Sequence, residues 1–382
     1  MDKTLETFRE KAKEFALAEL APFAAQIDKD DEFPTDMWKK IGDANLMGIT
    51  IPKEYGGEGL SYLHHVIAVE EFSRASGSAG FAYAAHSNIC VDNLYKSGTE
   101  DQRKKYLPKL ISGEHVGALA MSEPNAGSDV VGSMECHAEK KGNVWITNGT
   151  KRWITNGPYA STFIVYMRTA GKEAGSKSIT AFLVEKGMKG FTQGIKKDKL
   201  GMRGAGNCEL YFENCEIPEE NVLGEVNKGV ALLMNGLDSE RLILCAGPLG
   251  IMQSALDLIV PYVQEREQFG QPIANFQMVQ AKIAEMYTRL EASRGMVYRL
   301  GENFATHKNR NRDAAAACLF SSESSTAVAL DAIQLMGGRG YMNEEVPGRL
   351  LRDSKIYEIG GGTNEIRKMI IARDLTKPVK GK

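Results

Sequence analysis

Residues 276–304, FQMVQAKIAEMYTRLEASRGMVYRLGENF, decide the fold class of this chain. Apolar residues recur here at steps of three and four, which puts them on one face of a helix and predicts the seam of a helix bundle. The seam consists of Phe276, Val279, Ile283, Met286, Leu290, Val297, Leu300 and Phe304. The Ala-rich residues 314–335 predict a second, closely packed bundle helix. We therefore expect a helical C-terminal domain over residues 227–382.

The residues before this domain fall into two stretches of different character. Residues 1–118 show helical spacing of apolar side chains, for example at Phe8, Ala12 and Phe15. Residues 119–226 instead contain runs of β-branched and aromatic residues between Gly, Asn and Pro, which predict strands. The runs are 144–147, 162–167, 179–184 and 209–212. The expected fold class is α+β and multidomain, with helical, β-rich and again helical domains in this order.

A short repeat lies in the β-rich stretch. The sequence WITNG occurs at residues 145–149 and again at residues 153–157. Asn-Gly pairs are typical of tight turns between antiparallel strands. The repeat therefore predicts a β-hairpin in which both Trp-Ile-Thr runs are strands and both Asn-Gly pairs are turns.

The composition is that of an ordinary globular protein. The 382 residues are 43% hydrophobic and 25% charged, with 47 Lys and Arg against 49 Asp and Glu. A net charge of −2 offers no basic field to a phosphate backbone, so we expect no nucleic-acid partner. The least polar stretch, residues 242–256, is shorter than the roughly 20 residues that a membrane span needs. We expect a buried bundle helix there and no membrane span.

The cysteines and the N-terminus bear on the compartment. Six cysteines lie far apart, without a CxxC pair or a neighbouring His at metal-ligand spacing. We therefore expect reduced thiols and no metal site. The start of the sequence, Met1-Asp2-Lys3, has the features of neither a signal peptide nor an Arg-rich transit leader.

Two loops are candidates for ligand binding, since the common motifs for nucleotides, zinc and hydrolytic serines are absent from the sequence. Residues 121–129, MSEPNAGSD, combine hydroxyls, small residues and a turn, which suits backbone N–H groups that meet a polar ligand. A plain surface turn is the simpler explanation of the same residues. Residues 266–277 offer an Arg for phosphate and a Phe for stacking, or they serve only to connect two helices.

Glu240 is the third candidate. On a helix, its neighbours at three and four residues are Gly236, Leu237, Ile243, Leu244 and Gly247, none of which is cationic. The adjacent Arg241, by contrast, has Asp238 three residues before it. A buried carboxylate without a local partner has a raised pKa, as a general base working near neutral pH requires. The alternative is that this face meets solvent or an Arg from another element.

Six segments occur in the order found in acyl-CoA dehydrogenases, and the chain resembles that family from end to end. The segments are 120–129, 153–157, 200–203, 266–277, 334–341 and 362–365. The resemblance implies an N-terminal helical domain (1–118), a middle β-barrel-like domain (119–226) and a C-terminal four-helix bundle (227–382). It also implies a homotetramer with one FAD per subunit, acyl-CoA as substrate and electron-transfer flavoprotein as partner. The expected compartment is the mitochondrial matrix, with a leader removed, or a bacterial cytoplasm.

The resemblance implies two sets of binding residues. The flavin set is Leu119, Ala120, Met121, Ser122, Glu123, Pro124, Asn125, Ala126, Gly127, Ser128, Trp153, Ile154, Thr155, Arg266, Gln277, Gln334, Leu335, Met336, Gly337, Gly338, Thr363, Asn364 and Glu365. Within it, Arg266 and Gln277 are expected to serve the flavin of a neighbouring subunit. The acyl-CoA set is Ser128, Ser176, Lys177, Ala231, Asp238, Ser239, Glu240, Arg241, Gly361 and Gly362.

The position of the base separates branches of this family. Most members carry the catalytic Glu directly before the Gly-Thr of the C-terminal motif, where this chain has Gly361, and Glu358 lies three positions early. In the branch that oxidises isovaleryl-CoA, the base comes from the bundle helix, in a segment similar to residues 237–241. The resemblance therefore implies Glu240 as the base. Lys177, Ala231 and Phe81 depart from the pattern of that branch, which has Arg, Tyr and Leu there.

The implied activity is the FAD-dependent α,β-dehydrogenation of a short branched acyl-CoA. The expected reaction converts isovaleryl-CoA to 3-methylcrotonyl-CoA, a step of leucine catabolism. Gly360 and Gly361 replace a Tyr-Glu pair and are expected to leave room beside the acyl chain, while Phe81 shortens the pocket. The alternatives are another short-chain or branched-chain acyl-CoA dehydrogenase, an acyl-CoA oxidase, or a helical scaffold without flavin.

Overall fold

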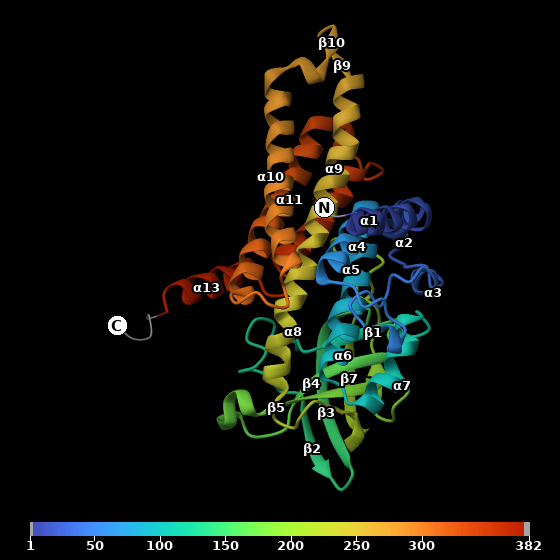
Figure 1. Cartoon of the computed structure of the whole chain (residues 1–382), viewed down its shortest axis with the longest axis vertical. Helices are drawn as coiled ribbons and strands as arrows, with labels where there is room; N and C mark the ends of the chain where they lie inside the picture. The colour runs from blue at the N-terminus through green and yellow to red at the C-terminus, as the bar shows by residue number, and fades with distance from the viewer. Residues whose placement is uncertain (1–2, 378–382) are drawn as a thin grey trace.

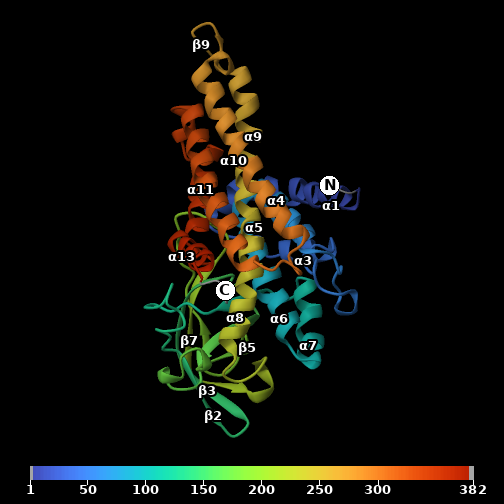
Figure 2. The ribbon, with the colours of Figure 1, turned by 60° about the vertical axis from the view of Figure 1, so that its left-hand side comes forward.

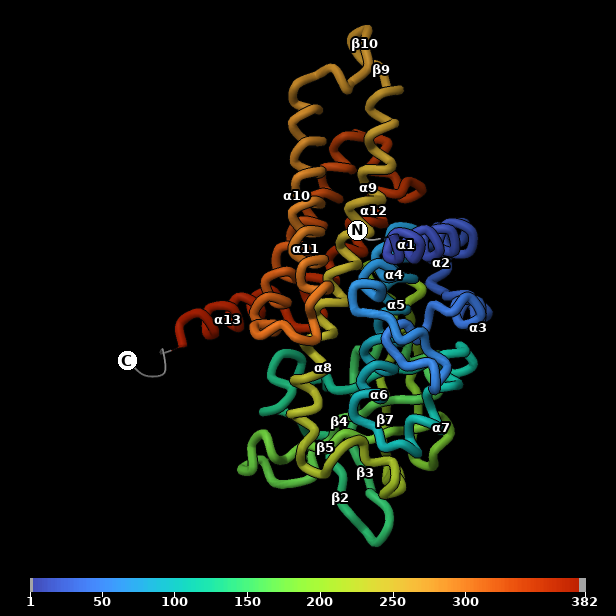
Figure 3. The backbone as a smooth tube through the Cα atoms, viewed as in Figure 1, coloured from blue at the N-terminus to red at the C-terminus, as the bar shows by residue number. Residues whose placement is uncertain are grey.

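The computed structural model describes residues 3–377, which form an elongated molecule with a β domain at one end and long helices at the other (Figure 1). The N-terminal helices lie beside the junction of these two parts. The turned view in Figure 2 keeps α9, α10 and α11 side by side along the long axis. The backbone trace shows α13 leaving the bundle to one side (Figure 3).

The N-terminal part is helical, as its spacing predicts. Its helices are α1 (Lys3–Phe15), α2 (Ala24–Asp30), α3 (Met37–Asp43), α4 (Tyr62–Ala75), α5 (Gly77–Ala84), α6 (Asn93–Ser97) and α7 (Glu100–Ile111), with wider π-helical segments at Ala16–Leu20 and Ala85–Asp92. Helix α4 packs on α9 so closely that a Cβ added at Gly250 of α9 would lie 2.3 Å from the Glu70 carbonyl oxygen. Arg294 of α10 reaches the buried Glu70 carboxylate at 2.9 Å, which ties the N-terminal helices to the bundle.

The β domain is one sheet. Its strands are β1 (Gly117–Ala120), β2 (His137–Lys141), β3 (Val144–Thr155), β4 (Thr162–Arg168), β5 (Ile179–Glu185), β6 (Phe191–Gln193), β7 (Asn207–Pro218) and β8 (Val222–Leu223). The strand order is β6-β7-β3-β2-β4-β5-β8, and β1 pairs with β4 in parallel. Every residue of β4 is buried, because this strand lies at the centre of the packed sheet.

The hairpin expected from the WITNG repeat is wrong, although the second pair, Asn156-Gly157, does lie in a turn. Both Trp-Ile-Thr runs lie in the single strand β3, and Asn148-Gly149 falls inside that strand rather than in a turn. The pairing of β3 with β7 shifts register between Thr147 and Gly149, and Gly149 has φ of 134°. The first Asn-Gly pair therefore makes a β-bulge, which needs the same permissive backbone as a turn and gives the same sequence signal.

The C-terminal part begins with α8 (Gly229–Leu244) and α9 (Ala246–Glu265), which meet at Cys245. The remaining helices are α10 (Gln277–Glu302), α11 (Arg310–Met336), α12 (Val346–Ser354) and α13 (Asn364–Leu375). The strands β9 (Glu267–Gln268) and β10 (Gln271–Pro272) form a small hairpin at the tip between α9 and α10 (Figure 1). Gly229–Glu265 is long and apolar enough for a membrane span, but 72% of its most apolar window is buried inside the protein. It is a core element of the bundle.

The predicted seam of α10 faces this core. Met286, Leu290, Val297 and Leu300 are buried, and Val279 and Ile283 at the start of the helix are partly covered. Helix α11 spans the predicted Ala-rich stretch and packs on α9 and α10. All six cysteines are buried and unpaired in disulfides.

We expect Leu290→Ala to lower the free energy of unfolding by about 2–5 kcal/mol, because it leaves a cavity in the bundle core. Differential scanning calorimetry checks this as a lower Tm. Glu285→Ala on the exposed face of the same helix is the matched control and should leave the Tm nearly unchanged. Equal effects of both substitutions would contradict the assigned seam.

Candidate active site around Glu240

Helix α8 carries the Glu240 side chain into the protein interior. Glu240 is 7% exposed, and the apolar Leu237, Ile243 and Leu244 on the same helix are buried around it. Within residues 3–377, no side chain or backbone group donates a hydrogen bond to its carboxylate. Burial raises the pKa of Glu240 to about 7, and the positive charges of Arg241 and Arg367 offset part of that rise. The carboxylate is therefore shielded from solvent and has a cation from another element nearby.

Gly361 lies directly against this carboxylate. A Cβ added at Gly361 would lie 3.4 Å from Glu240 Oε1 and 2.7 Å from Leu244 Cδ1. Its φ of 67° lies in the left-handed region that favours glycine. The room expected at Gly361 is thus partly filled by Leu244, and the glycine is required for the close approach of the turn to α8.

Arg367 holds the turn that carries Gly361. This fully buried side chain donates from Nη1 to the Tyr357 carbonyl oxygen at 2.5 Å and from Nη2 to the Gly360 carbonyl oxygen at 2.7 Å. It also donates to Asn364 Oδ1 at 2.8 Å. No sequence pattern indicates a role for Arg367, since an Arg on a helix is usually an exposed side chain.

Glu358, the rival base, is engaged elsewhere. Its carboxylate accepts hydrogen bonds from Thr326 of α11 and from Lys355, the latter at 2.6 Å. Partial burial favours a higher pKa for Glu358, but these hydrogen bonds outweigh burial and the pKa is lowered. Glu358 is therefore a structural contact between its turn and α11.

The loop after β1 is anchored by a buried ion pair. Lys151 Nζ lies 2.7 Å from Glu123 Oε1, and both side chains are almost completely buried. Glu123 also accepts hydrogen bonds from the backbone N–H groups of Glu135 and Cys136 at 2.7 and 3.0 Å. The Glu123 side chain is thus directed into the protein, and no sequence pattern indicates Lys151 as its partner. The exposed residues between 121 and 129 are Pro124, Asn125, Gly127, Ser128 and Asp129.

Trp153 stands out in β3. Its φ is 60°, a left-handed value that is unusual for a non-glycine residue, and its side chain is 51% exposed. The β3–β7 register shifts between Lys151 and Ile154, so a bulge turns this ring outward. A Cβ added at Gly127 would lie 3.8 Å from Trp153 Cζ3, which puts the ring beside the exposed loop. Ile154 is buried and Thr155 is partly covered.

The expected acyl-CoA residues gather on α8. Asp238 accepts hydrogen bonds from Asn311 at 2.7 Å and Arg310 at 3.3 Å, and it lies 3.5 Å from Arg241. The buried Arg241 leaves its Nε and Nη1 without a hydrogen-bond partner, so it retains donors for a ligand. Ser239 is buried and Ala231 exposed on the same helix. Ser176 and Lys177 lie in an exposed turn (Lys172–Lys177) that contacts α8.

A third group lies at the tip of the bundle. Arg266 ends α9 and Gln277 begins α10, on either side of the β9–β10 hairpin (Figure 1). The residues from Gln334 to Gly338 end α11 at the same end, where Arg339 lies 5.9 Å from the Tyr262 ring of α9. Leu335 and Met336 are buried, and Gln334, Gly337 and Gly338 are exposed. This group is separated along the molecule from Trp153 and the loop after β1.

The start of α13 lies nearer to Glu240. Thr363 caps this helix by accepting a hydrogen bond from the Ile366 N–H at 3.4 Å. Asn364 is buried with its Oδ1 bound by Arg367 and by Ser322, while Glu365 is exposed. Gly362 precedes the cap with φ of 92°.

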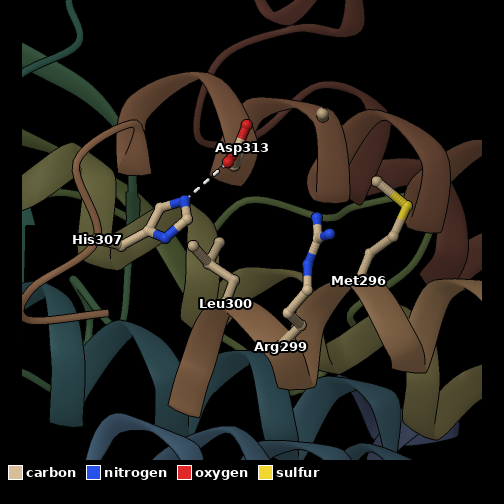
Figure 4. Close-up of a pocket in the computed structure, with 6 residues that line it drawn as sticks. Met296, Arg299, Leu300, His307 and Asp313 are labelled. Carbon is tan, nitrogen blue, oxygen red and sulfur yellow. Dashed lines mark hydrogen bonds and ion pairs between the residues drawn. The ribbon is translucent and has the colours of Figure 1, made fainter. Parts of the chain in front are cut away.

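A small pocket of about 40 Å³ lies between α10 and α11 (Figure 4). His307 Nε2 lies 2.7 Å from Asp313 Oδ2 at its edge. Its lining residues are Met296, Arg299, Leu300, His307, Asp313 and Ala316. None of the expected site residues lines it.

The chain matches three family models along nearly its whole length. They are described as the N-terminal, middle and C-terminal domains of acyl-CoA dehydrogenase and match residues 2–114, 118–215 and 227–376. The chain is 57% identical to the mitochondrial isovaleryl-CoA dehydrogenase of Oryza sativa, over 98% of this chain and 92% of the relative. It is 54% identical to the mitochondrial 2-methylacyl-CoA dehydrogenase of Solanum tuberosum, over 99% and 92%. The solved butyryl-CoA dehydrogenase of Megasphaera elsdenii superposes with a TM-score of 0.95 at 33% identity, covering 99% of both chains.

We expect Gly361→Ala to lower both the Tm and the activity, because the new Cβ would collide with Leu244 and strain a left-handed backbone. The strain alone is worth about 1–2 kcal/mol. Gly295→Ala is the control, since a Cβ there meets nothing within 4 Å and the residue lies inside α10. Calorimetry and a dehydrogenation assay of both variants check this. A Gly361→Ala protein as stable and active as Gly295→Ala would contradict the close approach.

Proposed function

Because the chain belongs to the acyl-CoA dehydrogenase family, we propose that it dehydrogenates a short branched acyl-CoA, preferably isovaleryl-CoA, to the 2-enoyl-CoA. The observation that carries this proposal is the contact between the Glu240 carboxylate and Gly361. Gly361 occupies the sequence position of the base in most of the family, and the carboxylate comes instead from α8. In this proposal the base lies beside the expected place of the thioester, but it comes from α8 and not from the turn that carries Gly361.

Glu240 takes the α-proton of the acyl group in this proposal. With a pKa of about 7, a large fraction of its carboxylate is ionised at neutral pH, and it is basic enough to accept a proton. Burial among Leu237, Ile243 and Leu244 keeps water away from the carboxylate. This arrangement suits the abstraction of a weakly acidic proton next to a carbonyl.

The developing enolate needs a donor near the thioester oxygen. The Gly361 N–H makes no hydrogen bond within the described residues, so it is free to donate. One such donor is typically worth about 3 kcal/mol of transition-state stabilisation. Arg241, whose Nε and Nη1 make no hydrogen bond, adds further donors for the bound acyl-CoA.

The residues present fit FAD. Trp153 presents an exposed ring beside a loop in which Pro124, Asn125, Gly127 and Ser128 are exposed, as a flavin-binding surface requires. Bound FAD would supply the acceptor for the β-hydride. The chain's own contribution is to hold the loop in place through the buried pair of Lys151 and Glu123.

A homotetramer explains the separation of the expected flavin residues. Arg266 and Gln277 flank the β9–β10 hairpin at the tip of the bundle, whereas Trp153 belongs to β3 of the β domain, at the other end of the molecule (Figure 1). One FAD can meet both groups only if a second copy of the chain brings its tip to the flavin. We propose that electrons leave through electron-transfer flavoprotein, and that the enzyme works in the mitochondrial matrix or a bacterial cytoplasm.

Two contacts support a short, branched acyl chain. Leu244 fills part of the space at Gly361, and Phe81 packs edge-on against Tyr357 at 5.8 Å between ring centroids. In this proposal, both apolar groups restrict the space for a long acyl chain. A 2-methyl-branched acyl-CoA is the second candidate, since the chain is 54% identical to a 2-methylacyl-CoA dehydrogenase.

We expect Glu240→Gln to fold and retain FAD but to lose dehydrogenation by about 100-fold or more, because the amide keeps the shape and removes the base. Glu358→Gln is the matched control and should remain active. In the wild-type enzyme, kcat/KM for acyl-CoA should fall as the pH drops below about 7, because protonated Glu240 cannot accept a proton. A dead Glu358→Gln enzyme beside an active Glu240→Gln enzyme would move the base to Glu358.

We expect isovaleryl-CoA to have a higher kcat/KM than octanoyl-CoA, because the proposal has Leu244 and Phe81 restrict the space for a long acyl chain. The test is an acyl-CoA panel that also holds butyryl-, valeryl- and 2-methylbutyryl-CoA, with electron-transfer flavoprotein or a dye as acceptor. Butyryl- and valeryl-CoA should be slower by only about 10- to 200-fold, the usual discrimination for one methylene. A preference for octanoyl-CoA would contradict the steric role of Leu244 and Phe81. A preference for 2-methylbutyryl-CoA would favour the 2-methyl-branched substrate, and rapid peroxide formation would indicate an oxidase.

A further inference from the structure

Arg367 of α13 joins three parts of the candidate site. Its guanidinium is 1% exposed and binds the carbonyl oxygens of Tyr357 and Gly360, which flank the turn leading to Gly361. A Cβ added at Gly361 would lie 4.0 Å from Arg367 Nη2, compared with 3.4 Å from Glu240 Oε1. The Arg367 guanidinium and the Glu240 carboxylate thus both lie close to the position that a Gly361 side chain would take.

We propose that Arg367 is a positioning residue that fixes the Gly360–Gly361 turn against the Glu240 carboxylate and provides its counter-charge from outside α8. This inference rests on the proposed function, because it assigns Glu240 as the base. Arg367 has no role in the chemistry itself. Arg367 acts indirectly, because it fixes the position of the Gly361 N–H and stabilises the negative charge of Glu240.

The hydrogen bonds support the positioning role. Two carbonyl oxygens accept from two different Arg367 nitrogen atoms, and Asn364 Oδ1 takes a third donor at 2.8 Å. A guanidinium offers these donors in a fixed fork, whereas the single ammonium of Lys cannot bridge the same acceptors. The turn contains three successive glycines, 360–362, two of which have positive φ. A flexible turn of this kind needs an external anchor to keep one conformation.

The charges around Glu240 support the second role. Arg241 on the same helix and Arg367 on α13 are the cations that lower its pKa, against the larger effect of burial. Tyr166 of β4 and Cys318 of α11 also interact electrostatically with the carboxylate from the other packed elements. Arg241 keeps Asp238 3.5 Å from its Nη1, so part of its charge is neutralised. Within the described residues no carboxylate forms an ion pair with Arg367, which leaves its charge available to Glu240.

The test compares Arg367→Gln and Arg367→Lys in the full-length holoenzyme. Arg367→Gln removes both the fork and the charge, so the acidic limb of kcat/KM for isovaleryl-CoA should move to higher pH. We expect a shift of roughly one pH unit or more, since a nearby opposite charge typically changes a carboxyl pKa by about 1–3 units. Arg367→Lys keeps the charge but not the fork, so its limb should stay near that of the wild type. Its kcat should still fall by about 10- to 100-fold, the usual cost of a misplaced group.

Arg168 provides a matched control. It is another buried arginine that donates to backbone carbonyl oxygens, to Met134 at 3.0 Å and to Val131 at 2.8 Å, inside the β domain. Arg168→Gln should also lower the Tm but leave the pH limb unchanged. A general effect of losing a buried arginine would move the limb in both Gln variants and would overturn the proposal.

A spectroscopic readout separates this inference from the proposed function. The infrared band of protonated Glu240, identified as the carboxyl band that Glu240→Gln removes, can be titrated without substrate. Its midpoint should rise in Arg367→Gln and stay in place in Arg367→Lys. An unchanged midpoint together with a wild-type pH limb would overturn the inference even if the wild-type enzyme oxidises isovaleryl-CoA. An inactive wild-type enzyme would instead count against the proposed function, while the titration would still decide the role of Arg367. If Arg367→Gln does not fold, a wild-type kcat in Arg367→Lys overturns the proposal.

Discussion

The burial of the Glu240 carboxylate against the Gly361 turn is the constraint on which the site depends. A buried carboxylate is costly because it loses the hydration of its charge, and its proton affinity rises as a result. Here the cost is limited by Arg367 and Arg241, and the pKa comes to lie at about 7. Burial of this carboxylate is costly, but it also raises the pKa to a value that suits a general base. Gly361 follows from this placement, since any larger residue would collide with Leu244 and crowd the carboxylate.

The β domain and the bundle contribute differently to this site. The bundle provides rigid helices, so that Glu240 and Arg241 project from α8, which packs against α11. The β domain provides an irregular edge, in which a bulge turns Trp153 outward and a buried Lys151–Glu123 pair holds the neighbouring loop. A loop held in this way can present its backbone to a ligand without large ordering costs on binding.

Much of the fold follows from periodicity in the sequence. The seam from Met286 to Leu300 and the Ala-rich α11 are long and regular, so their type and approximate extent are predictable from spacing alone. The WITNG repeat misled because an Asn-Gly pair reports a permissive backbone, which a bulge and a turn both need. The order of strands in the sheet also had no local signal, because it depends on pairing between residues far apart in the chain.

The candidate site could be predicted only in part from the sequence. Helical spacing predicts the apolar neighbours of Glu240 on α8. It does not predict whether this face of the helix is buried or meets solvent. The partners Arg367 and Lys151 could not be found, because each comes from a distant element and neither lies in a motif. The prediction of open space at Gly361 was also incomplete. It considered the side chains that are missing there but not Leu244, which fills part of that space from α8.

Proton exchange tests the central claim most directly, because it isolates the base from the redox step. 3,3-Dimethylbutyryl-CoA carries α-hydrogens but no β-hydrogen, so it cannot be dehydrogenated. Incubated in D2O with the holoenzyme, it should gain deuterium at its α-carbon in the presence of the wild-type and Glu358→Gln enzymes. With Glu240→Gln, mass spectrometry should detect no exchange above that in buffer. Undiminished exchange with folded, flavin-loaded Glu240→Gln would contradict the assignment of Glu240 as the base.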